Sequence, residues 1–185
     1  MTLMKEFRTP ADFWFGMVEP DFADCEANKA DLRAAFHAAI SLYHMHDWVW
    51  KARADEVKLL FTYSSGDRKM RAVHGARSFA NALEQQYPDF GRIRSIANAA
   101  KHLELTEIRP VENAASHASN TAVQVPGAGL GGYGVGAGYG TPGLSYAGLP
   151  RVMLAGPNGN DIEFFHLAKT VRDMWTGLRA SHGWW

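Results

Sequence analysis

Cysteine is almost absent from this sequence, and its scarcity excludes several classes of protein. Cys25 stands alone among 185 residues, so no disulfide can form within the chain and no cysteine-based metal site can close. Long apolar runs are absent too, because no stretch approaches the roughly 18 apolar residues that a membrane-spanning helix needs. The first residues also lack the apolar core of a signal peptide. We therefore expect a cytoplasmic protein with no membrane partner.

Net charge is also missing, since 19 Lys and Arg balance 19 Asp and Glu. The balance is uneven along the chain, with a net charge of −4 over residues 1–50, +4 over residues 51–109 and zero over residues 110–185. Such a division suits self-association or a modest polyanion-binding face, and charges that only solvate helix surfaces also produce it. The length and the 46% of hydrophobic residues predict one globular domain.

The common catalytic and nucleotide-binding motifs are lacking. The chain has no Gly-x-Ser-x-Gly elbow and no Gly-Lys-Ser/Thr phosphate loop. A literal G-x-G-x-x-G runs from Gly127 to Gly132, but composition alone produces it in so glycine-rich a segment. More glycine follows at the point where a phosphate-binding helix should begin. We therefore expect no nucleotide and no other cofactor.

Eight histidines raise the question of a metal site, and their spacing argues against one. His37 and His44 share a helix face, but they are separated by about 10.5 Å along the axis, which is too long for one ion. Glu163-x-x-His166 has the spacing found in di-iron bundles, but it falls in a predicted strand, where the two side chains point in opposite directions. We expect no metal ion.

What the sequence does contain is mostly helical periodicity. Thr9 and Pro10 predict a helix start, because a hydroxyl caps free N–H groups and proline suits the first turn. Pro20 then predicts a kink or a break. Asn28 is predicted to cap the next helix, over residues 29–53, whose apolar residues recur at three-to-four spacing. Residues 58–63 suit either a strand or a helix end.

The downstream pattern predicts two more helices, three strands and a last helix around Trp175. The two helices are predicted at 67–86 and at 90–105, the second capped by Asp89. The strands are predicted at 122–125, 151–155 and 161–167, and the last helix ends at about residue 182. The predicted fold class is mainly α: a helical bundle of about four main helices, with a glycine-rich insertion and a short β-hairpin before the C-terminal helix. The single domain, 1–185, divides into a helical core (1–109), a polar and Gly/Tyr-rich insertion (110–150) and a hairpin plus C-terminal helix (151–185).

The glycine-rich segment has an unusual composition. Ten of the 18 glycines fall within residues 127–148, interleaved with Tyr133, Tyr139 and Tyr146. Glycine offers no side chain for a core and is costly to order, and idle loops of this length are uncommon. We expect either an irregular connector or an interaction segment, in which the tyrosines anchor a protein partner, a second copy of the chain or stacked bases.

The most informative constellation joins two predicted helices. On the first, His44 and Asp47 lie within one turn of each other. On the second, Asn98 and His102 are four residues apart on one face, with Lys101 beside them. Asp47 against Lys101 or His102 would make a charge-assisted pair across the bundle. The set is either a structural network of satisfied polar groups or a functional site.

The segments Leu42-Tyr-His-Met-His-Asp-Trp48 and Ile96-Ala-Asn-Ala-Ala-Lys-His102 resemble small bacterial and phage proteins with a HEPN-like helical core, over roughly residues 30–105. The resemblance implies a helical bundle that is frequently dimeric and, in many members, a metal-independent RNase of toxin or defence systems. The family hallmark is an arginine, a polar residue and, after four to six intervening positions, a histidine. Asn98 and His102 match two of these positions, but Ala97 stands where the arginine would be.

Two hypotheses follow, and the absent arginine favours the first. It is a non-catalytic HEPN-like binding or interaction module, of phage or prophage origin, that forms homo-oligomers or holds a protein partner. The Gly/Tyr segment and exposed aromatic residues such as Trp184 and Trp185 would provide the contacts.

The alternative hypothesis is a metal-independent RNase of the HEPN type that acts on RNA. The resemblance then implies that His102 is the general acid or base, that Asn98 contacts phosphate or sugar and that Lys101 stabilises charge. Asp47 and His44 would orient this set. Lys101 would replace the missing arginine as a point charge, without the bidentate fork of a guanidinium.

Overall fold

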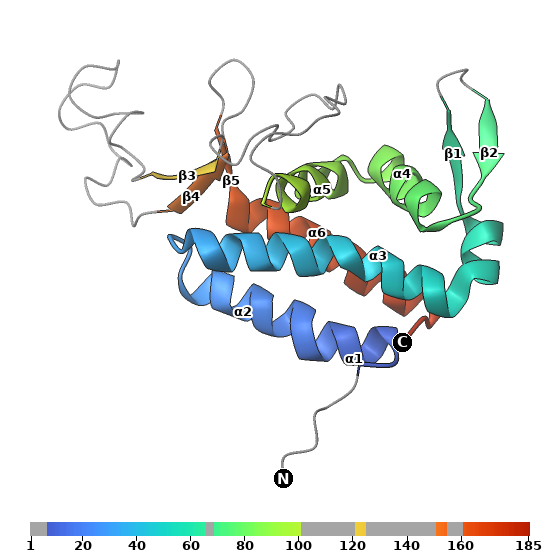
Figure 1. The fold of residues 1–185 in the computed structure, drawn as a ribbon, viewed down its shortest axis with the longest axis horizontal. Helices are drawn as coiled ribbons and strands as arrows, with labels where there is room; N and C mark the ends of the chain where they lie inside the picture. Colours follow the sequence, from blue (N-terminus) through green and yellow to red (C-terminus); the bar gives the residue numbers. More distant parts are fainter. Residues whose placement is uncertain (1–6, 66–68, 101–120, 125–150, 155–160) are drawn as a thin grey trace, which may run out of the picture.

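The structure is a computed structural model that describes residues 7–65, 69–100, 121–124, 151–154 and 161–185. The predicted mainly α fold, with a hairpin before the last helix, is confirmed (Figure 1). The helical elements are α1 (Pro10–Phe13), the π-helical turn η1 (Trp14–Val18), α2 (Glu19–Ala27), α3 (Leu32–Leu60), α4 (Ala76–Gln86), α5 (Pro88–Ala99) and α6 (Phe164–His182). The strands are β1 (Thr62–Ser64), β2 (Met70–Ala72), β3 (Thr121–Gln124), β4 (Arg151–Leu154) and β5 (Ile162–Glu163). The Gly/Tyr segment lies outside the described residues.

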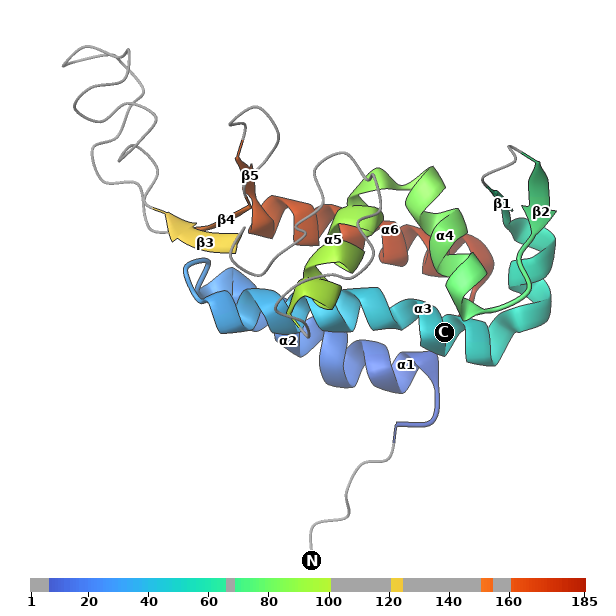
Figure 2. The same cartoon turned by 45° about the horizontal axis from the view of Figure 1, so that its top comes forward.

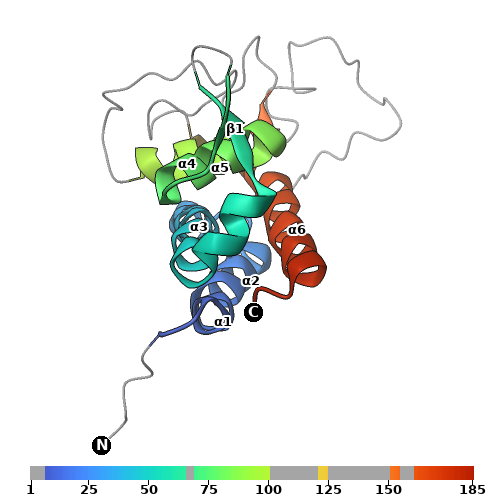
Figure 3. The same cartoon turned by 90° about the vertical axis from the view of Figure 1, so that its right-hand side faces the viewer.

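The long helix α3 forms the centre of the bundle. Helices α1 and α2 pack along one side of it, α4 and α5 along the opposite side, and α6 along a third (Figure 3). Figure 2 shows α5 crossing α3 near the middle of its length. Many of the buried residues of α3 are alanines, which let the neighbouring helices approach closely. The buried apolar residues of this helix are Ala34, Ala35, Ala38, Ala39, Leu42, Met45, Val49 and Val57.

The first helix begins as predicted but does not break at Pro20. The Thr9 hydroxyl accepts a hydrogen bond from the Asp12 N–H, and the Asp12 carboxylate accepts one from the Thr9 N–H, which completes a capping box. Pro20 has no N–H to donate and would clash with the carbonyl one turn earlier in a regular α-helix. The wider π turn over Trp14–Val18 directly precedes α2 and lets the helical path continue through the proline.

The predicted start of α3 is wrong, and its predicted end at residue 53 falls at a kink within a longer helix. The helix is capped by Asp31, whose carboxylate accepts hydrogen bonds from the N–H groups of Arg33 and Ala34. The Asn28 side chain instead accepts a hydrogen bond from the Ala30 N–H in the turn before the helix. The helix then continues to Leu60 through a kink at Arg53, where φ is −135° and ψ is 30°. Residues 58–63 accordingly contain both proposed elements, a helix end and the start of β1.

Helix α4 begins later than predicted, and helix α5 begins earlier. Residues 70–72 form β2, which pairs antiparallel with β1, and α4 starts only after Gly75. Helix α5 begins at Pro88, so Asp89 lies in its first turn, where it forms an ion pair with Arg92, instead of capping the helix.

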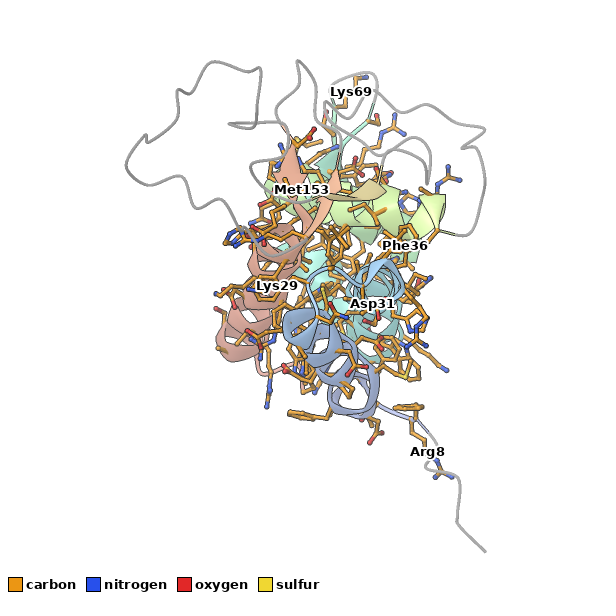
Figure 4. All side chains as sticks on the ribbon, turned by 90° about the vertical axis from the view of Figure 1, so that its left-hand side faces the viewer. Arg8, Lys29, Asp31, Phe36, Lys69 and Met153 are labelled. Carbon is orange, nitrogen blue, oxygen red and sulfur yellow. The ribbon has the colours of Figure 1, made fainter. Side chains whose placement is uncertain are left out.

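The predicted hairpin is present, with a third strand added to it. Strand β4 pairs antiparallel with both β3 and β5. The Val152 N–H donates to the Lys29 carbonyl at 2.7 Å, which ties β4 to the turn between α2 and α3 (Figure 4 labels Lys29 and Asp31 at this turn). Helix α6 starts at Phe164, so the predicted strand over residues 161–167 ends after Glu163.

Large aromatic side chains fill the core where α3, α4, α5 and α6 meet. Trp175 is fully buried, and its indole N–H donates to the Leu42 carbonyl of α3 at 3.0 Å. Trp184 is only 1% exposed, so the prediction that it offers an exposed contact for partners is wrong. Its carbonyl accepts a hydrogen bond from Arg53, and the half-buried Trp185 packs on the Trp14 and Trp175 rings. Trp184 and Trp185 therefore belong to the core.

The cap of α3 offers a direct test of this arrangement. We expect Asp31→Ala to lower the free energy of unfolding by about 1 kcal/mol, because two N–H groups lose their acceptor. Asn28→Ala is the matched control and should cost less than about 0.5 kcal/mol, since Asn28 lies outside the helix. Urea unfolding followed by circular dichroism measures both. A larger loss for Asn28→Ala would contradict the assignment of the cap.

Candidate functional site

A hollow among the described residues lies between the η1–α2 segment and α3. Its volume is about 450 Å³. Its walls combine apolar and polar side chains, namely Phe13, Met17, Asp21, His37, Ile40, Ser41, His44, Asp47 and Trp48. We call this hollow the α2–α3 pocket. A cavity of this size with a few converging polar groups is typical of sites that bind small ligands or single side chains.

The periodicity of α3 places its pocket residues in one row. His37, Ser41, His44 and Trp48 are separated by four, three and four residues, so they lie on one face of the helix. From residue 37 to residue 48 this row extends roughly 16 Å along the axis. Because the η1–α2 segment and α3 run in opposite directions (Figure 1), Asp21 faces the His37 end and Phe13 faces the Trp48 end.

The Trp48 end of the pocket is aromatic. The rings of Phe13 and Trp48 are stacked, with centroids 5.1 Å apart and an interplanar angle of 15°. Trp48 remains half-buried in this contact. Stacking holds both side chains in fixed orientations and presents an apolar wall to the pocket. The aromatic wall is therefore part of the scaffold and needs little ordering when a ligand binds.

The predicted pair of His44 and Asp47 is formed. His44 Nδ1 and Asp47 Oδ2 are 2.8 Å apart, so the exposed carboxylate orients the imidazole at the pocket rim. Asp47 Oδ1 also lies 3.3 Å from Nε2 of His46, which is buried behind the rim. Asp47 thus connects one pocket histidine with one core histidine.

One hydrogen bond fixes the orientation of the buried His46 ring. Its Nδ1 donates to the Tyr43 carbonyl at 2.6 Å, and its Nε2 faces Asp47. Burial lowers the pKa of His46, although the Asp47 charge and the Tyr43 carbonyl act in the opposite direction. The buried ring is therefore neutral at pH 7, with its proton on Nδ1.

Asp21 differs from the other charged residues of the pocket. Burial raises the pKa of its carboxyl, while the Ser41 hydroxyl and His37 lower it. Among the described residues Asp21 has no ion pair, although its neighbour on α2, Glu19, forms one with Arg172 at 2.9 Å. A half-buried carboxylate without a cation is unfavourable for the folded protein.

A smaller hollow of about 260 Å³ continues beyond Asp21 and His37. It is lined by Asp24, Asp31 and Arg33 in addition to these two residues. Despite this acidic lining, no group of three or more His, Cys, Asp or Glu side chains within the described ranges is arranged to hold a metal ion. His37 and His44 line one pocket, as their shared helix face predicted, without forming a metal site.

The second half of the predicted constellation is only partly described. Asn98 lies half-buried in the last turn of α5, the helix that crosses α3. Lys101 and His102 lie outside the described residues, so their pairing with Asp47 stays a prediction. Tyr133, Tyr139 and Tyr146 lie outside them as well.

The arginines of α5 have structural partners. Arg94 lies one turn before Asn98, and its guanidinium binds Glu84 at 2.9 Å and Asn81 at 2.8 Å, both on α4. Arg92 forms an ion pair with Asp89 at 2.6 Å in its own helix. These contacts clamp α4 to α5 and occupy the donors that a phosphate would otherwise meet.

The prediction for Glu163 and His166 is wrong. Because α6 begins at Phe164, the two residues are one helical turn apart, and His166 Nε2 lies 3.3 Å from Glu163 Oε2. Glu163 also forms an ion pair with Arg151 of β4 at 2.6 Å. The carboxylate joins the sheet to the start of α6.

Sequence reasoning missed most of the α2–α3 pocket. His44, Asp47 and Trp48 were expected to cluster, but Asp21, Ser41 and Phe13 were not assigned to a site. The signal was present in α3, where His37, Ser41 and His44 interrupt an otherwise apolar pattern at helical spacing. The residues contributed by α2 required knowledge of which helix packs on that face.

Comparisons of the chain with protein-family models, with curated proteins and with solved structures find no match. In the part of the chain that is described, no helix combines the length and the apolar character needed to cross a membrane.

The burial of His46 leads to a pH-dependent stability. Its folded-state pKa lies below the ordinary value of 6.5, so the unfolded chain takes up a proton first as the pH falls. The stability contributed by the neutral ring is complete above about pH 6.5 and is lost as the pH drops towards the folded-state pKa. We expect the free energy of unfolding to fall as the pH is lowered below about 6.5.

His46→Asn isolates this contribution, because the amide keeps a donor for the Tyr43 carbonyl but does not titrate. Its unfolding free energy should vary less over that pH range than that of the unmodified protein. His74→Asn is the control, since His74 is exposed and should leave the pH dependence unchanged. An unaltered slope in His46→Asn would contradict a buried neutral imidazole. Urea titrations at each pH provide the measurement.

Proposed function

We propose that the protein is a HEPN-like helical binding module, non-catalytic, whose binding site is the α2–α3 pocket. The observation that carries the proposal is a hollow of about 450 Å³ with a stacked aromatic wall at one end and a carboxylate without an ion pair at the other. His44 and Asp47, which belong to the segment that resembles HEPN proteins, lie on its rim. The pocket therefore connects the family resemblance with a binding role.

The described side chains support binding better than catalysis. The Ser41 hydroxyl donates to the Ala38 carbonyl at 3.3 Å and is buried, so it is not poised as a nucleophile. The pocket lining contains no lysine or arginine to stabilise a phosphate. On α5, Arg92 and Arg94 are engaged by carboxylates. The RNase alternative consequently depends on Lys101 and His102, together with Asn98.

An interaction with a second copy or another protein is part of the same proposal. Leu59 is 87% exposed and Met70 is 64% exposed, and both lie at the end of the molecule that carries the β1–β2 hairpin (Figure 1). Apolar side chains that are this large and this exposed are available for contact with a partner chain. The Gly/Tyr segment would add further contacts.

Filling the pocket tests the binding role. We expect a saturation-transfer NMR screen of small amines, alcohols and aromatic fragments to find ligands for the unmodified protein. His37→Trp should abolish their binding, because His37 is an exposed residue of the pocket wall and the indole occupies the cavity. Lys51→Trp is the matched control, an exposed position of α3 outside the pocket, and should retain the ligands. Ligands that bind both variants equally would place the site elsewhere.

The non-catalytic assignment has its own test. We expect no degradation of labelled total RNA by the purified protein in EDTA, because the motif lacks its arginine. His102→Ala should then behave like the unmodified protein. Cleavage that disappears in His102→Ala would replace the proposal with the RNase alternative. Gel electrophoresis of the RNA at several times distinguishes the outcomes.

A further inference from the structure

The lining of the α2–α3 pocket has carboxylates but no lysine or arginine. The lining has two carboxylates, Asp21 and Asp47, and two imidazoles, His37 and His44, but neither an ammonium nor a guanidinium group. Asp24 on the next turn of α2 adds a further negative charge near Asp21. An anionic ligand would be repelled on entry, whereas a cation would be attracted.

The two carboxylates are not equivalent. Asp47 is exposed and already bonded to His44. Asp21 is half-buried and takes part in no ion pair of the described residues, with the Ser41 hydroxyl as its polar neighbour. Two other half-buried carboxylates of the bundle meet guanidinium groups: Glu19 meets Arg172, and Glu84 meets Arg94. A cationic ligand would complete the same pattern at Asp21.

The space beside Asp21 has an apolar continuation. Met17, Ile40, Phe13 and Trp48 line the pocket from the Asp21 end towards the aromatic pair. A ligand with its charge at Asp21 would therefore lay an apolar body along this wall. A compact inorganic cation would leave the wall empty, and a neutral apolar molecule would leave the carboxylate unpaired.

We propose that the α2–α3 pocket binds a protonated amine on an alkyl stem, with the ammonium at Asp21 and the stem against Met17 and Ile40. This assignment rests on the proposed function and specifies its ligand. The same chemistry occurs in a free alkylamine and in the lysine side chain of a partner protein. Both present a three-donor head on a flexible apolar chain.

Three probes of equal length separate the charge from the stem. n-Hexylammonium, 1-hexanol and hexanoate are titrated into the full-length protein, with binding followed by the shifts of indole N–H signals in NMR spectra. We expect hexylammonium to bind at least about tenfold more tightly than hexanol, which corresponds to one charge-assisted hydrogen bond. Hexanoate should not bind. A short acetylated and amidated Gly-Lys-Gly peptide, compared with Gly-Gln-Gly, tests the lysine source.

Two isosteric variants locate the charge. Asp21→Asn should reduce the preference for hexylammonium over hexanol to about twofold or less, because the amide keeps the shape but not the charge. Glu26→Gln is the matched control on the same helix, at an exposed position that lines neither hollow, and should leave the preference unchanged. An equal loss in both variants would reduce the effect to general surface attraction and overturn the assignment to Asp21.

The outcomes distinguish the two levels of the proposal. Equal binding of hexanol and hexylammonium would overturn the amine assignment and leave the pocket as a binding site. Failure of all probes, together with no effect of His37→Trp on any ligand, would overturn both. Binding of the lysine peptide but not of the glutamine peptide would support recognition of a partner protein, and binding of hexylammonium alone would support a small free amine.

Discussion

The fold depends on the burial of one long helix on three sides. Helix α3 can be covered by α1–α2, by α5 and by α6 because its buried positions are small, with alanines at residues 34, 35, 38 and 39. The decisive contact is the indole N–H of Trp175, which donates to the Leu42 carbonyl in the middle of α3. This bond satisfies a buried donor and fixes α6 along the helix. The Trp184 ring then closes the core over Phe61 and Phe79.

The α2–α3 pocket results from the way in which the other helices cover α3. The faces that contact α5 and α6 are apolar, and the row from His37 to Trp48 is what remains towards the η1–α2 segment. Polar side chains on that row cannot be fully covered without partners, so the two segments enclose a space instead of a dry interface. The Phe13–Trp48 stack closes one end, and the Asp21 carboxylate occupies the other. The pocket therefore changes along α3 from an aromatic end at Trp48 to an acidic end at Asp21.

Local rules predicted much of the fold, and tertiary context decided the rest. The Thr9 cap, the helical periodicity of α3 and the hairpin before α6 depend on short-range chemistry, and the structure contains them. A kink or a break was predicted at Pro20, and the structure has a π turn directly before it. The buried position of Trp184 depends on contacts with distant helices. In the site, the His44–Asp47 pair followed from i, i+3 spacing. Asp21 could not be assigned, since no spacing rule relates α2 to α3.

The ion pairs of the bundle explain why Asp21 points to a ligand. Arg94–Glu84, Arg172–Glu19 and Arg151–Glu163 each join two different elements, so these charges stabilise contacts between helices or between sheet and helix. Asp21 forms no ion pair among the described residues; burial makes its charged form less favourable, and Ser41 and His37 oppose this effect. An ammonium at Asp21, as proposed, would complete the same pattern between the pocket and its ligand. The difference between the free and bound states of this carboxylate would then drive binding.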